Sequence, residues 1–286
     1  MNAAIQACAE IVRRDDPHLH ATALFAPEPA RSRLMVLYAF DCELSRATRA
    51  SRESMIPRMR LQWWRDVAAR ALGDGPAPEH EVAGPLTQLI RSDPSMRSDM
   101  EEFPGRDVLS QMIDGHEATL DAPFDIDAFT AWAGARFGAR LALAGSILPG
   151  GPDQGRMADR SVAGQALGFA LACRTALRMV RDQGHCLLPD MRGPALTALA
   201  RGELPDDAAR ALSTKARMLL DDLKALRGKR RELKGAALAA HLPLLRERRV
   251  LRLVARDASA ILGQIDPVDR PFQGLGLALA AWRGRW

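Results

Sequence analysis

Four arginines in two short segments carry the clearest chemical signal in this sequence. They are Arg46 and Arg49 in YAFDCELSRATR, and Arg174 and Arg178 in RTALRMVRDQ. A guanidinium group binds a phosphate through two parallel hydrogen bonds, and it needs no metal ion to do so. The pattern predicts a site for an anion, such as a diphosphate or a lipid headgroup, provided that the fold brings the two segments together.

The carboxylates near these arginines are poorly placed to bind Mg²⁺. Asp41 and Glu43 are two residues apart and project about 200° from each other on a helix, whereas side chains that meet on one helix face are three or four residues apart. Asp182 has Arg178 four residues before it, which is an ordinary ion-pair spacing. An alternative for the arginines stays open, in which they are neutralised by Asp41, Asp66 and Asp182.

The spacing of cysteine and histidine predicts neither a metal site nor a disulfide framework. The four cysteines are far apart and include no C-x-x-C pair, which is typical of buried single thiols in a reducing compartment. Cys186 follows His185, but one such pair falls far short of four tetrahedral ligands. His18 and His20 are two residues apart and would point to different faces of a helix. We expect no bound metal and no cofactor.

Composition limits the classes of protein that fit. The chain has 286 residues and is 47% hydrophobic, which is enough for one large core. Its net charge of +5 favours anionic partners, but basic and aromatic residues are not interleaved, so we expect no nucleic-acid binding. We expect no signal peptide, and no apolar run reaches the ~18 residues that span a bilayer. The prediction is a cytoplasmic protein whose segment 240–256, apolar on one side and basic on the other, is a candidate for peripheral contact with the inner membrane.

The elements that must position these residues are predicted to be helices throughout. Apolar residues recur at helical spacing, and breaks such as GDGPAP separate the segments. Asp125 or Asp127 is a candidate N-cap, and Pro243 interrupts a later helix. The predicted helices cover 31–49, a segment from Pro57 to the GDGPAP break, 80–92, 106–119, a segment from 125 or 127 to about 148, 155–182, 195–201, 205–231, 235–262 and 272–286.

Two further features concern the assembly of these helices. Gly164 and Gly168 are four residues apart in the long Ala-rich helix, and small residues at this spacing permit close approach of another helix. No alternating strand pattern and no long repeat appears. We therefore predict a single all-α domain that spans residues 1–286.

The first arginine segment resembles the first active-site helix of the squalene/phytoene synthase family. That family shows a pattern close to Y-A-F-C-R-x-x-D-D-x-x-D, and residues 38–40 match its start. RLQWWRD (60–66) resembles the Arg/Trp segment that follows, while QMIDGHEATLD (111–121) and AWAGARFGARL (131–141) resemble the stretch before the second active-site helix. The resemblance implies an isoprenoid synthase-like helical bundle around a central, mostly apolar cavity, with the two active-site helices facing each other.

The resemblance also locates the acidic positions at which this family holds Mg²⁺. On the first helix they are occupied by Ser45, Arg46 and Arg49. On the second helix, where the family shows a pattern like N-x-x-R-D-V-x-E-D, they are occupied by Met179, Asp182 and Gln183. Because Mg²⁺ prefers hard oxygen ligands, a chain that keeps one acidic residue of six at these positions is predicted to have no catalytic residues and no metal site.

Within the family, the chain most resembles a branch that includes a mitochondrial complex I assembly factor and its bacterial relatives. This branch shows F-x-x-E-L followed by R-L-Q-W-W-R-D, which Phe40, Glu43, Leu44 and residues 60–66 match. Its members keep the fold and lack the aspartate motifs. The resemblance implies a catalytically degenerate, non-enzymatic binding or assembly factor for a respiratory or membrane complex. The alternative is a prenyltransferase that uses Mg²⁺ to couple two prenyl diphosphates head to head.

The same resemblance places a set of residues around the former catalytic cavity. The candidate cavity or anion-binding residues are Tyr38, Asp41, Arg46, Arg49, Arg60, Trp64, Arg65, Arg174 and Arg178. The candidate partners are a respiratory-complex subunit, an anionic lipid or a prenyl diphosphate.

Overall fold

The computed structural model of the chain describes residues 3–51, 53, 55–73, 75–97, 105–122, 124–147, 157–229, 236–263, 265 and 273–283, and every regular element in these ranges is helical. The elements of the first part are α1 (Ala3–Asp15), α2 (Pro17–Ala23), α3 (Ala30–Thr48), α4 (Met55–Leu72), α5 (Ala83–Ser92), η1 (Pro94–Arg97), α6 (Gly105–Glu117) and η2 (Ala118–Asp121). The second part comprises α7 (Ile126–Ala133), η3 (Gly134–Gly138), α8 (Ala139–Ser146), α9 (Met157–Gln183), α10 (Gly193–Ala200), α11 (Asp206–Lys229), α12 (Ala236–His241), α13 (Leu244–Arg256), η4 (Ala258–Leu262) and α14 (Gln273–Trp282).

The N-terminal helices α1 and α2 are absent from the sequence prediction. The signal for α2 is nevertheless local and readable. Asp16 caps this helix, its Oδ1 accepts a hydrogen bond from the Leu19 backbone N–H at 2.9 Å, and Pro17 follows as the first helical residue. An Asp-Pro pair at these two positions satisfies an otherwise free N–H and presets the backbone for a helix.

The segment predicted as one helix up to about residue 148 is divided in the structure. Asp125 is its N-cap, with Oδ1 accepting from the Ala128 N–H at 2.7 Å. The α-helical hydrogen bonding stops at Ala133, and η3, a single π-helical stretch, follows before α8. The prediction of a continuous α-helix is therefore wrong in its middle. A π-helical turn holds an extra residue, so it alters which side chains of the following helix face inward.

The π-helical stretch η3 packs against both α6 and α9. A Cβ atom at Gly115 would lie 2.5 Å from the backbone nitrogen of Arg136, and one at Gly164 would lie 2.9 Å from that of Gly138. Only glycine fits where backbones approach so closely. The close helix contact predicted from Gly164 and Gly168 is thus confirmed, and its partner is the α7–η3 segment.

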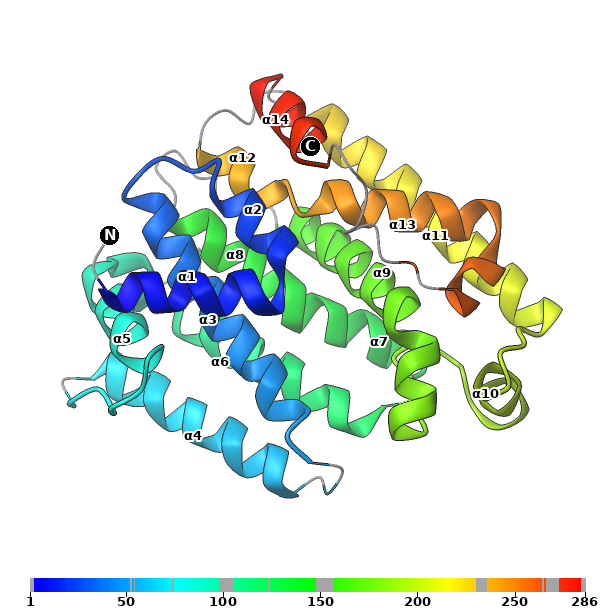
Figure 1. The fold of residues 1–286 in the computed structure, drawn as a ribbon, viewed down its shortest axis with the longest axis horizontal. Coiled ribbons are helices and arrows are strands. Elements are labelled where there is room, and N and C mark those ends of the chain that lie inside the picture. The colour runs from blue at the N-terminus through cyan, green and yellow to red at the C-terminus, as the bar shows by residue number, and fades with distance from the viewer. Residues whose placement is uncertain are drawn as a thin grey trace.

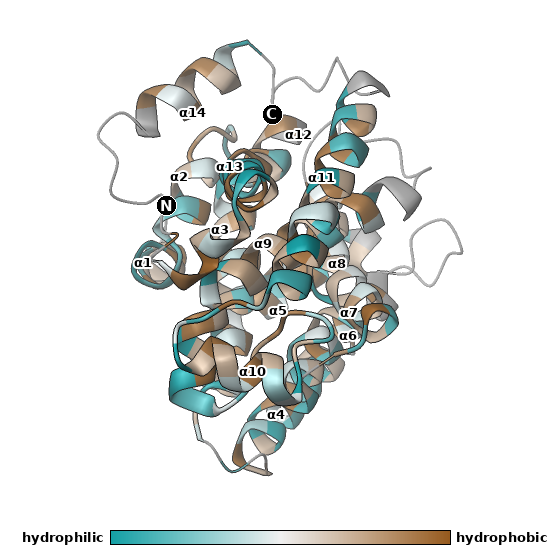
Figure 2. Cartoon of the chain, turned by 90° about the vertical axis from the view of Figure 1, so that its right-hand side faces the viewer, coloured by the Kyte–Doolittle hydropathy of each residue, from teal (hydrophilic) through white to brown (hydrophobic). Residues whose placement is uncertain are grey.

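The apolar interior divides into two clusters. The first joins α1, α3, α4, α5, α6 and α8 around side chains that include Tyr38 and Phe40. The second joins α7, α9, α11 and α13 around Phe129, Phe169 and Leu251. Most helices show alternating apolar and polar bands (Figure 2), as expected for helices that bury one face. In Figure 1 the helices of the first cluster gather around α3, and those of the second gather around α9.

Within the described ranges, no helix is both long enough and apolar enough to cross a bilayer.

Candidate functional site

Asp41 is the acidic residue that the first active-site segment turns inward. It is 6% exposed, and both of its carboxylate oxygens have partners. Oδ2 accepts from Nη1 of Arg140 at 2.7 Å, and Oδ1 contacts Nε2 of His116 at 2.7 Å. Burial would raise the pKa of Asp41, but the charge of Arg140 and the hydrogen bond from His116 outweigh it and hold the pKa far below its usual range. Asp41 is therefore an ionised, fully occupied carboxylate.

His116 supports Asp41 as a neutral side chain. It is completely buried, and burial together with the nearby charge of Arg136 lowers its pKa from 6.5 to about 4. An ionised carboxylate can only accept hydrogen bonds, so Nε2 of His116 carries the proton that it shares with Asp41. The other ring nitrogen, Nδ1, is then an acceptor, and it is buried with no hydrogen-bond partner from the residues that the structure describes.

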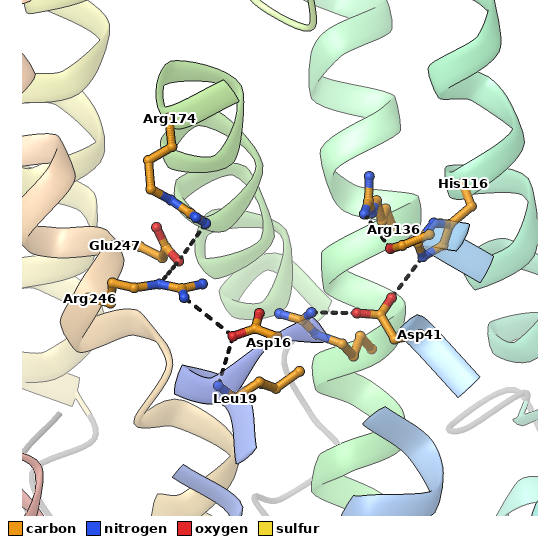
Figure 3. A network of polar contacts seen from close by, with 10 residues as sticks. Asp16, Leu19, Asp41, His116, Arg136, Arg174, Arg246 and Glu247 are labelled. Carbon is orange, nitrogen blue, oxygen red and sulfur yellow. Dashed lines mark hydrogen bonds and ion pairs between the residues drawn. The ribbon is translucent and has the colours of Figure 1, made fainter. Parts of the chain in front are cut away.

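A second buried network lies beside the first and joins the N-terminal region to α9 and α13 (Figure 3). Arg246 lies between two carboxylates, with Nη1 at 3.3 Å from Asp16 Oδ1 and Nε at 2.8 Å from Glu247 Oε1. Arg174 donates to the same oxygen of Glu247 at 3.2 Å. Burial raises the pKa of Glu247, but Arg174 and Arg246 outweigh it, so the net pKa is lowered. Glu247 Oε2, Arg174 Nε and His18 Nε2 are buried here and have no hydrogen-bond partner in the described part of the chain.

These two networks change the expected character of the interior. Asp16, at the junction of α1 and α2, bonds to Arg246 on α13, and these helices belong to different apolar clusters. A mostly apolar lining was predicted for the central cavity. Where the described helices of the two clusters meet, charged side chains connect them (Figure 3). The mostly apolar lining of a central cavity stays a prediction. Asp41 and Arg174 come from the two motif helices, whereas Asp16, Arg246 and Glu247 come from α13 and the junction of α1 and α2.

Arg136 is the least satisfied charge in this region. Its Nη2 donates to Ser45 Oγ at 3.1 Å, and its guanidinium carbon lies 5.0 Å from the Phe137 ring centroid and 6.0 Å from that of Trp132. No ion pair joins Arg136 to a carboxylate of the described residues. Burial lowers its pKa to about 10, and the positive charges of Arg140 and Arg49 act in the same direction. Its Nε and the Trp132 Nε1 are both buried without a hydrogen-bond partner among the described residues.

The three first-motif positions do not act together. Ser45 faces Arg136, as described above. Arg46 turns to the opposite side of α3, where its Nε lies 2.8 Å from Asp15 Oδ2 and its Nη1 lies 2.7 Å from Glu43 Oε1. Arg49 follows the end of α3 and is exposed. The predicted grouping of Arg46 with Arg49 around one anion therefore does not form, because α3 ends between them and their side chains diverge.

The second-motif positions lie in the last turn and a half of α9. Met179 is half-buried and packs against the second apolar cluster, whereas Arg178, Asp182 and Gln183 are exposed. Arg174, one turn earlier, is the arginine of this helix that turns inward. Arg174 and Arg178 thus do not line one site.

The alternative prediction was that Asp41, Asp66 and Asp182 neutralise the arginines. The structure pairs the arginines with other carboxylates. Arg46 and Arg174 are neutralised, but by Asp15, Glu43 and Glu247. Asp41 is paired with Arg140 instead. Asp66 accepts a hydrogen bond from the side-chain amide of Gln62. Of these partners, Glu43 lies three residues before Arg46 on α3, whereas Asp15 and Glu247 come from α1 and α13.

The residues present do not fit a Mg²⁺ cluster. Both oxygens of Asp41 are engaged, the first-motif positions carry a hydroxyl and two guanidinium groups, and Asp182 is exposed at the end of α9. Among the described residues, no group of three or more His, Cys, Asp or Glu side chains is arranged to hold a metal ion. Mg²⁺ needs several oxygen ligands in near-octahedral geometry, and this arrangement does not provide them.

The remaining candidates divide between the core and the surface. Tyr38 is buried, and burial raises its pKa to about 12. Arg65 pairs with Asp114 at 2.6 Å and with Glu117. Arg60 and Trp64 instead meet Arg46 at a surface cavity of about 390 Å³, which is lined by Glu43, Arg46, Ala47, Arg60, Trp63, Trp64 and His80.

Comparison with known proteins identifies the family. The sequence profile described as squalene/phytoene synthase matches residues 12–282. The chain belongs to the squalene/phytoene synthase family. Among solved structures, a dehydrosqualene synthase in complex with ligand resembles it with a TM-score of 0.75 at 13% sequence identity, over 98% of this chain and 95% of that chain. Comparison with curated protein sequences found no significant match. The predicted all-α isoprenoid synthase fold is thus confirmed.

The family resemblance pointed to the right helices but missed most residues of the interior networks. Asp16, His116, Arg136, Arg140, Arg246 and Glu247 were not predicted as site residues. A signal for some of them exists in the sequence. Arg136 and Arg140 stand four residues apart in the apolar segment AWAGARFGARL, and buried arginines need compensating partners. Such a pair indicates a polar site, although it does not reveal which carboxylate completes it.

Proposed function

We propose that this chain is a non-catalytic member of the squalene/phytoene synthase family that binds an anionic ligand without metal and assists a respiratory or membrane-bound complex. The observation that carries the proposal is the state of the first active-site helix. Its inward carboxylate, Asp41, is occupied by Arg140 and His116, and Ser45 at a former aspartate position accepts from Arg136.

Loss of catalysis follows from the charge that a prenyl-coupling reaction develops. Departure of a diphosphate from a prenyl chain needs stabilisation of negative charge, which a Mg²⁺ cluster supplies in metal-dependent enzymes. In the family pattern, six acidic residues would hold such a cluster. In this chain the six positions are occupied by Ser45, Arg46, Arg49, Met179, Asp182 and Gln183, of which Asp182 alone is acidic.

Retained anion binding is supported by the surroundings of Arg136. Arg49 lies near enough to lower the pKa of Arg136, and no ion pair joins either guanidinium to a carboxylate of the described residues. Ser45 and Trp132 add polar groups at the same place, and the Trp132 Nε1 and Arg136 Nε are donors without acceptors. Buried donors without partners are costly, so a phosphate or diphosphate that accepts from them would be bound favourably.

The enzymatic alternative is tested with purified protein. Radiolabelled farnesyl and geranylgeranyl diphosphates are supplied with Mg²⁺ and NADPH, and pyrophosphate release and hydrocarbon products are measured. We expect neither. Mg²⁺-dependent pyrophosphate release that disappears in Asp182→Ala would contradict the proposal and support head-to-head prenyl coupling.

The cellular role requires its own test, because it is supported by the likeness of Phe40, Glu43, Leu44 and residues 60–66 to the assembly-factor branch. Deletion of the gene is followed by measurement of NADH-dependent respiration and of polyisoprenoid content. We expect lost NADH oxidation with normal polyisoprenoids. Normal respiration with missing polyisoprenoids would contradict an assembly role at the inner membrane.

A further inference from the structure

Helix α14 turns a row of large apolar side chains outward. Leu275, Leu279 and Trp282 follow the i, i+4, i+7 spacing of one helix face and are 65%, 45% and 81% exposed. Leu277, on the opposite face, is 7% exposed and packs into the second apolar cluster. The helix contains no charged residue, and Figure 2 colours it mostly in the apolar range. An exposed apolar row of this kind indicates a surface that something covers.

The neighbouring helix α13 places arginines along one flank of this row. Arg249 and Arg252 are exposed on α13. A Cβ atom built at Gly276 would lie 3.3 Å from Nη2 of Arg249, so this guanidinium reaches the flank of α14. Arg283 follows α14, and its backbone N–H still bonds to the Leu279 carbonyl at 3.0 Å, so its side chain continues the flank that Gly276 begins. The apolar row is therefore bordered by guanidinium groups on the side that faces α13.

Positive charge accumulates on this side of α13. Arg249 and Arg252 form no ion pair within the described ranges, and Arg256 extends the same exposed side by one further turn. Burial lowers the pKa of the adjacent Arg248 to about 10, and the positive charges of Arg227 and Arg252 act in the same direction. The guanidinium groups thus repel one another, and a negatively charged surface would relieve this repulsion.

One exposed carboxylate lies beyond these arginines. Asp257 directly follows α13, about 12 Å along the helix axis from Arg249 and its contact with α14. Its Oδ1 accepts from the backbone N–H of Ser259 at 2.9 Å and from the Ser259 hydroxyl at 2.7 Å, so it caps η4. Asp257 therefore leaves the positive charge beside α14 in place.

The sequence pattern alone placed both an apolar and a basic side in segment 240–256. In the structure, the apolar side of this segment is covered, because Val250, Leu251 and Val254 of α13 are 0% exposed and belong to the second apolar cluster. These side chains do not reach a membrane while α13 stays packed. The exposed row of α14 takes their place beside the basic side of α13.

We propose that the outward row of α14 and the exposed arginines of α13 form one docking surface for a bilayer that contains anionic lipid. The apolar row enters the boundary between headgroups and acyl chains, and the arginines stay at the level of the lipid phosphates, as in other interfacial helices. Tryptophan is enriched at this boundary, and Trp282 is the most exposed side chain of the row. The inference rests on the proposed function, which brings the chain to a membrane-bound complex, and it names the surface that meets the membrane.

Charge and polarity distinguish a lipid surface from a protein partner. A second copy of the chain would bring the same arginines toward each other, and like charges repel. A different protein is recognised through hydrogen bonds as well as apolar contacts, but the outward row offers a single polar side-chain group, the Trp282 indole N–H. A bilayer surface requires no specific pattern of hydrogen bonds, and its anionic headgroups match the arginines.

The first experiment sediments the full chain with vesicles of phosphatidylcholine, prepared with and without phosphatidylglycerol. We expect binding to the vesicles that contain phosphatidylglycerol, and this binding should weaken as salt screens the arginines. Trp282→Ala should weaken it at least about tenfold, because the buried apolar area of the indole is lost. No binding to the anionic vesicles, or equal binding to both kinds, would overturn the proposal.

Met59→Ala is the matched control for loss of an exposed apolar side chain. Met59 is 65% exposed on α4, and α4 lies at the lower edge of the molecule whereas α14 lies at the upper edge in both overall views (Figures 1 and 2). Met59→Ala should leave vesicle binding unchanged. Equal losses in Met59→Ala and Trp282→Ala would show that α14 is not the docking surface.

Neutralising the arginines tests the electrostatic half of the surface. Arg252→Gln and Arg256→Gln should each weaken binding to the anionic vesicles about fivefold, as expected for one basic residue near an anionic membrane. Arg70→Gln is the control, since Arg70 is exposed on α4 and its loss changes the net charge equally. Circular dichroism and thermal unfolding check that each variant is folded. A loss of the same size in Arg70→Gln would contradict a docking role for α13.

Quenching by lipids with brominated acyl chains tests whether α14 enters the bilayer. Bromine quenches tryptophan fluorescence at short range, so quenching should fall in Trp282→Phe and stay unchanged in Trp63→Phe, which alters a 36% exposed tryptophan on α4. Quenching that depends on Trp63 would assign the contact to α4 instead, and bound protein without quenching would exclude insertion of the row. The vesicles contain no protein, so failure here is distinct from failure of the proposed assembly role, which gene deletion tests.

Discussion

Ser45 Oγ accepts a hydrogen bond from Nη2 of Arg136 at 3.1 Å, and this contact joins α3 to the π-helical stretch η3. By the family resemblance, Ser45 stands where the squalene/phytoene synthase pattern has an aspartate. A guanidinium group lies beside its hydroxyl, and Arg49 is a second nearby positive charge. We therefore predict that this place attracts an anion.

The anion site predicts a binding measurement that is insensitive to chelators. Calorimetry with a non-hydrolysable prenyl diphosphate should give the same affinity with and without EDTA. Arg136→Gln should weaken binding about tenfold or more, since hydrogen bonds to charged groups contribute about 1.5–3 kcal/mol. Arg217→Gln on α11 is the control for a lost surface charge. Binding that disappears in EDTA would instead indicate residual metal chemistry.

The Asp41–Arg140 pair predicts a large stability effect. Asp41→Asn leaves the buried Arg140 guanidinium without its counter-charge, and loss of one partner of a buried pair costs about 3–5 kcal/mol in the free energy of unfolding. Urea denaturation measures this loss. Arg140→Met in the Asp41→Asn background should recover part of it by removing the stranded charge. The exposed Asp66→Asn is the control, and a loss of similar size there would show that the effect is not specific to the buried pair.

The buried histidines predict loss of stability under mild acid. Burial is the main cause that lowers the pKa of both His116 and His18 from 6.5 to about 4. Between these values the unfolded chain binds a proton that the folded chain does not, so the free energy of unfolding falls as pH falls through this window. Asp41, whose pKa is depressed, adds a further loss only at lower pH, below its ordinary value.

The size of this effect is measurable by urea unfolding at two pH values. Each fully neutral histidine should contribute a loss of about 2 kcal/mol between about pH 7 and about pH 5. His116→Gln removes one titrating group, so its stability should depend less on pH over the same interval. A pH dependence unchanged by this substitution would contradict the assignment of neutral, buried His116.

The close contact at Gly164 predicts opposite effects for two Gly→Ala substitutions. A Cβ atom at Gly164 would meet backbone atoms of Gly138 and Ala133 at 2.9 and 3.0 Å, whereas one at Gly84 in α5 would meet nothing within 4 Å. Gly164→Ala should lower the unfolding midpoint, with a cost of about 1–3 kcal/mol. Gly84→Ala should be neutral or stabilising by up to about 1 kcal/mol, because alanine favours helices. Equal effects would argue against tight packing of α9 on η3.

Some features of the site were predictable because their signals are local. The helical spacing of residues 31–49 gave α3 to within one residue at each end, and the Asp125 cap and the Pro243 break lie where the sequence places them. That Ser45 and Arg49 are not acidic was also readable directly, because it depends only on residue type.

The partners of the charged residues were not predictable in this way. Asp41 and Glu43 are two residues apart, yet one is buried against Arg140 and the other faces Arg46 at the surface. The helix period alone separates their directions, but it does not say which direction is inward. The π-helical stretch between α7 and α8 precedes Arg140 and packs closely against Gly115 and Gly164, which are distant in the sequence.

The sequence by itself determined that this chain is an all-α protein of the squalene/phytoene synthase type. Helix periodicity, caps and motif spacing are properties of neighbouring residues, so they survive in the linear chain. Only the tertiary structure decided that Asp16 meets Arg246, that His116 and Arg140 share Asp41, and that Arg136 faces Ser45. These contacts join residues between 75 and 230 positions apart, and burial makes each charge depend on partners that the chain supplies only when it folds.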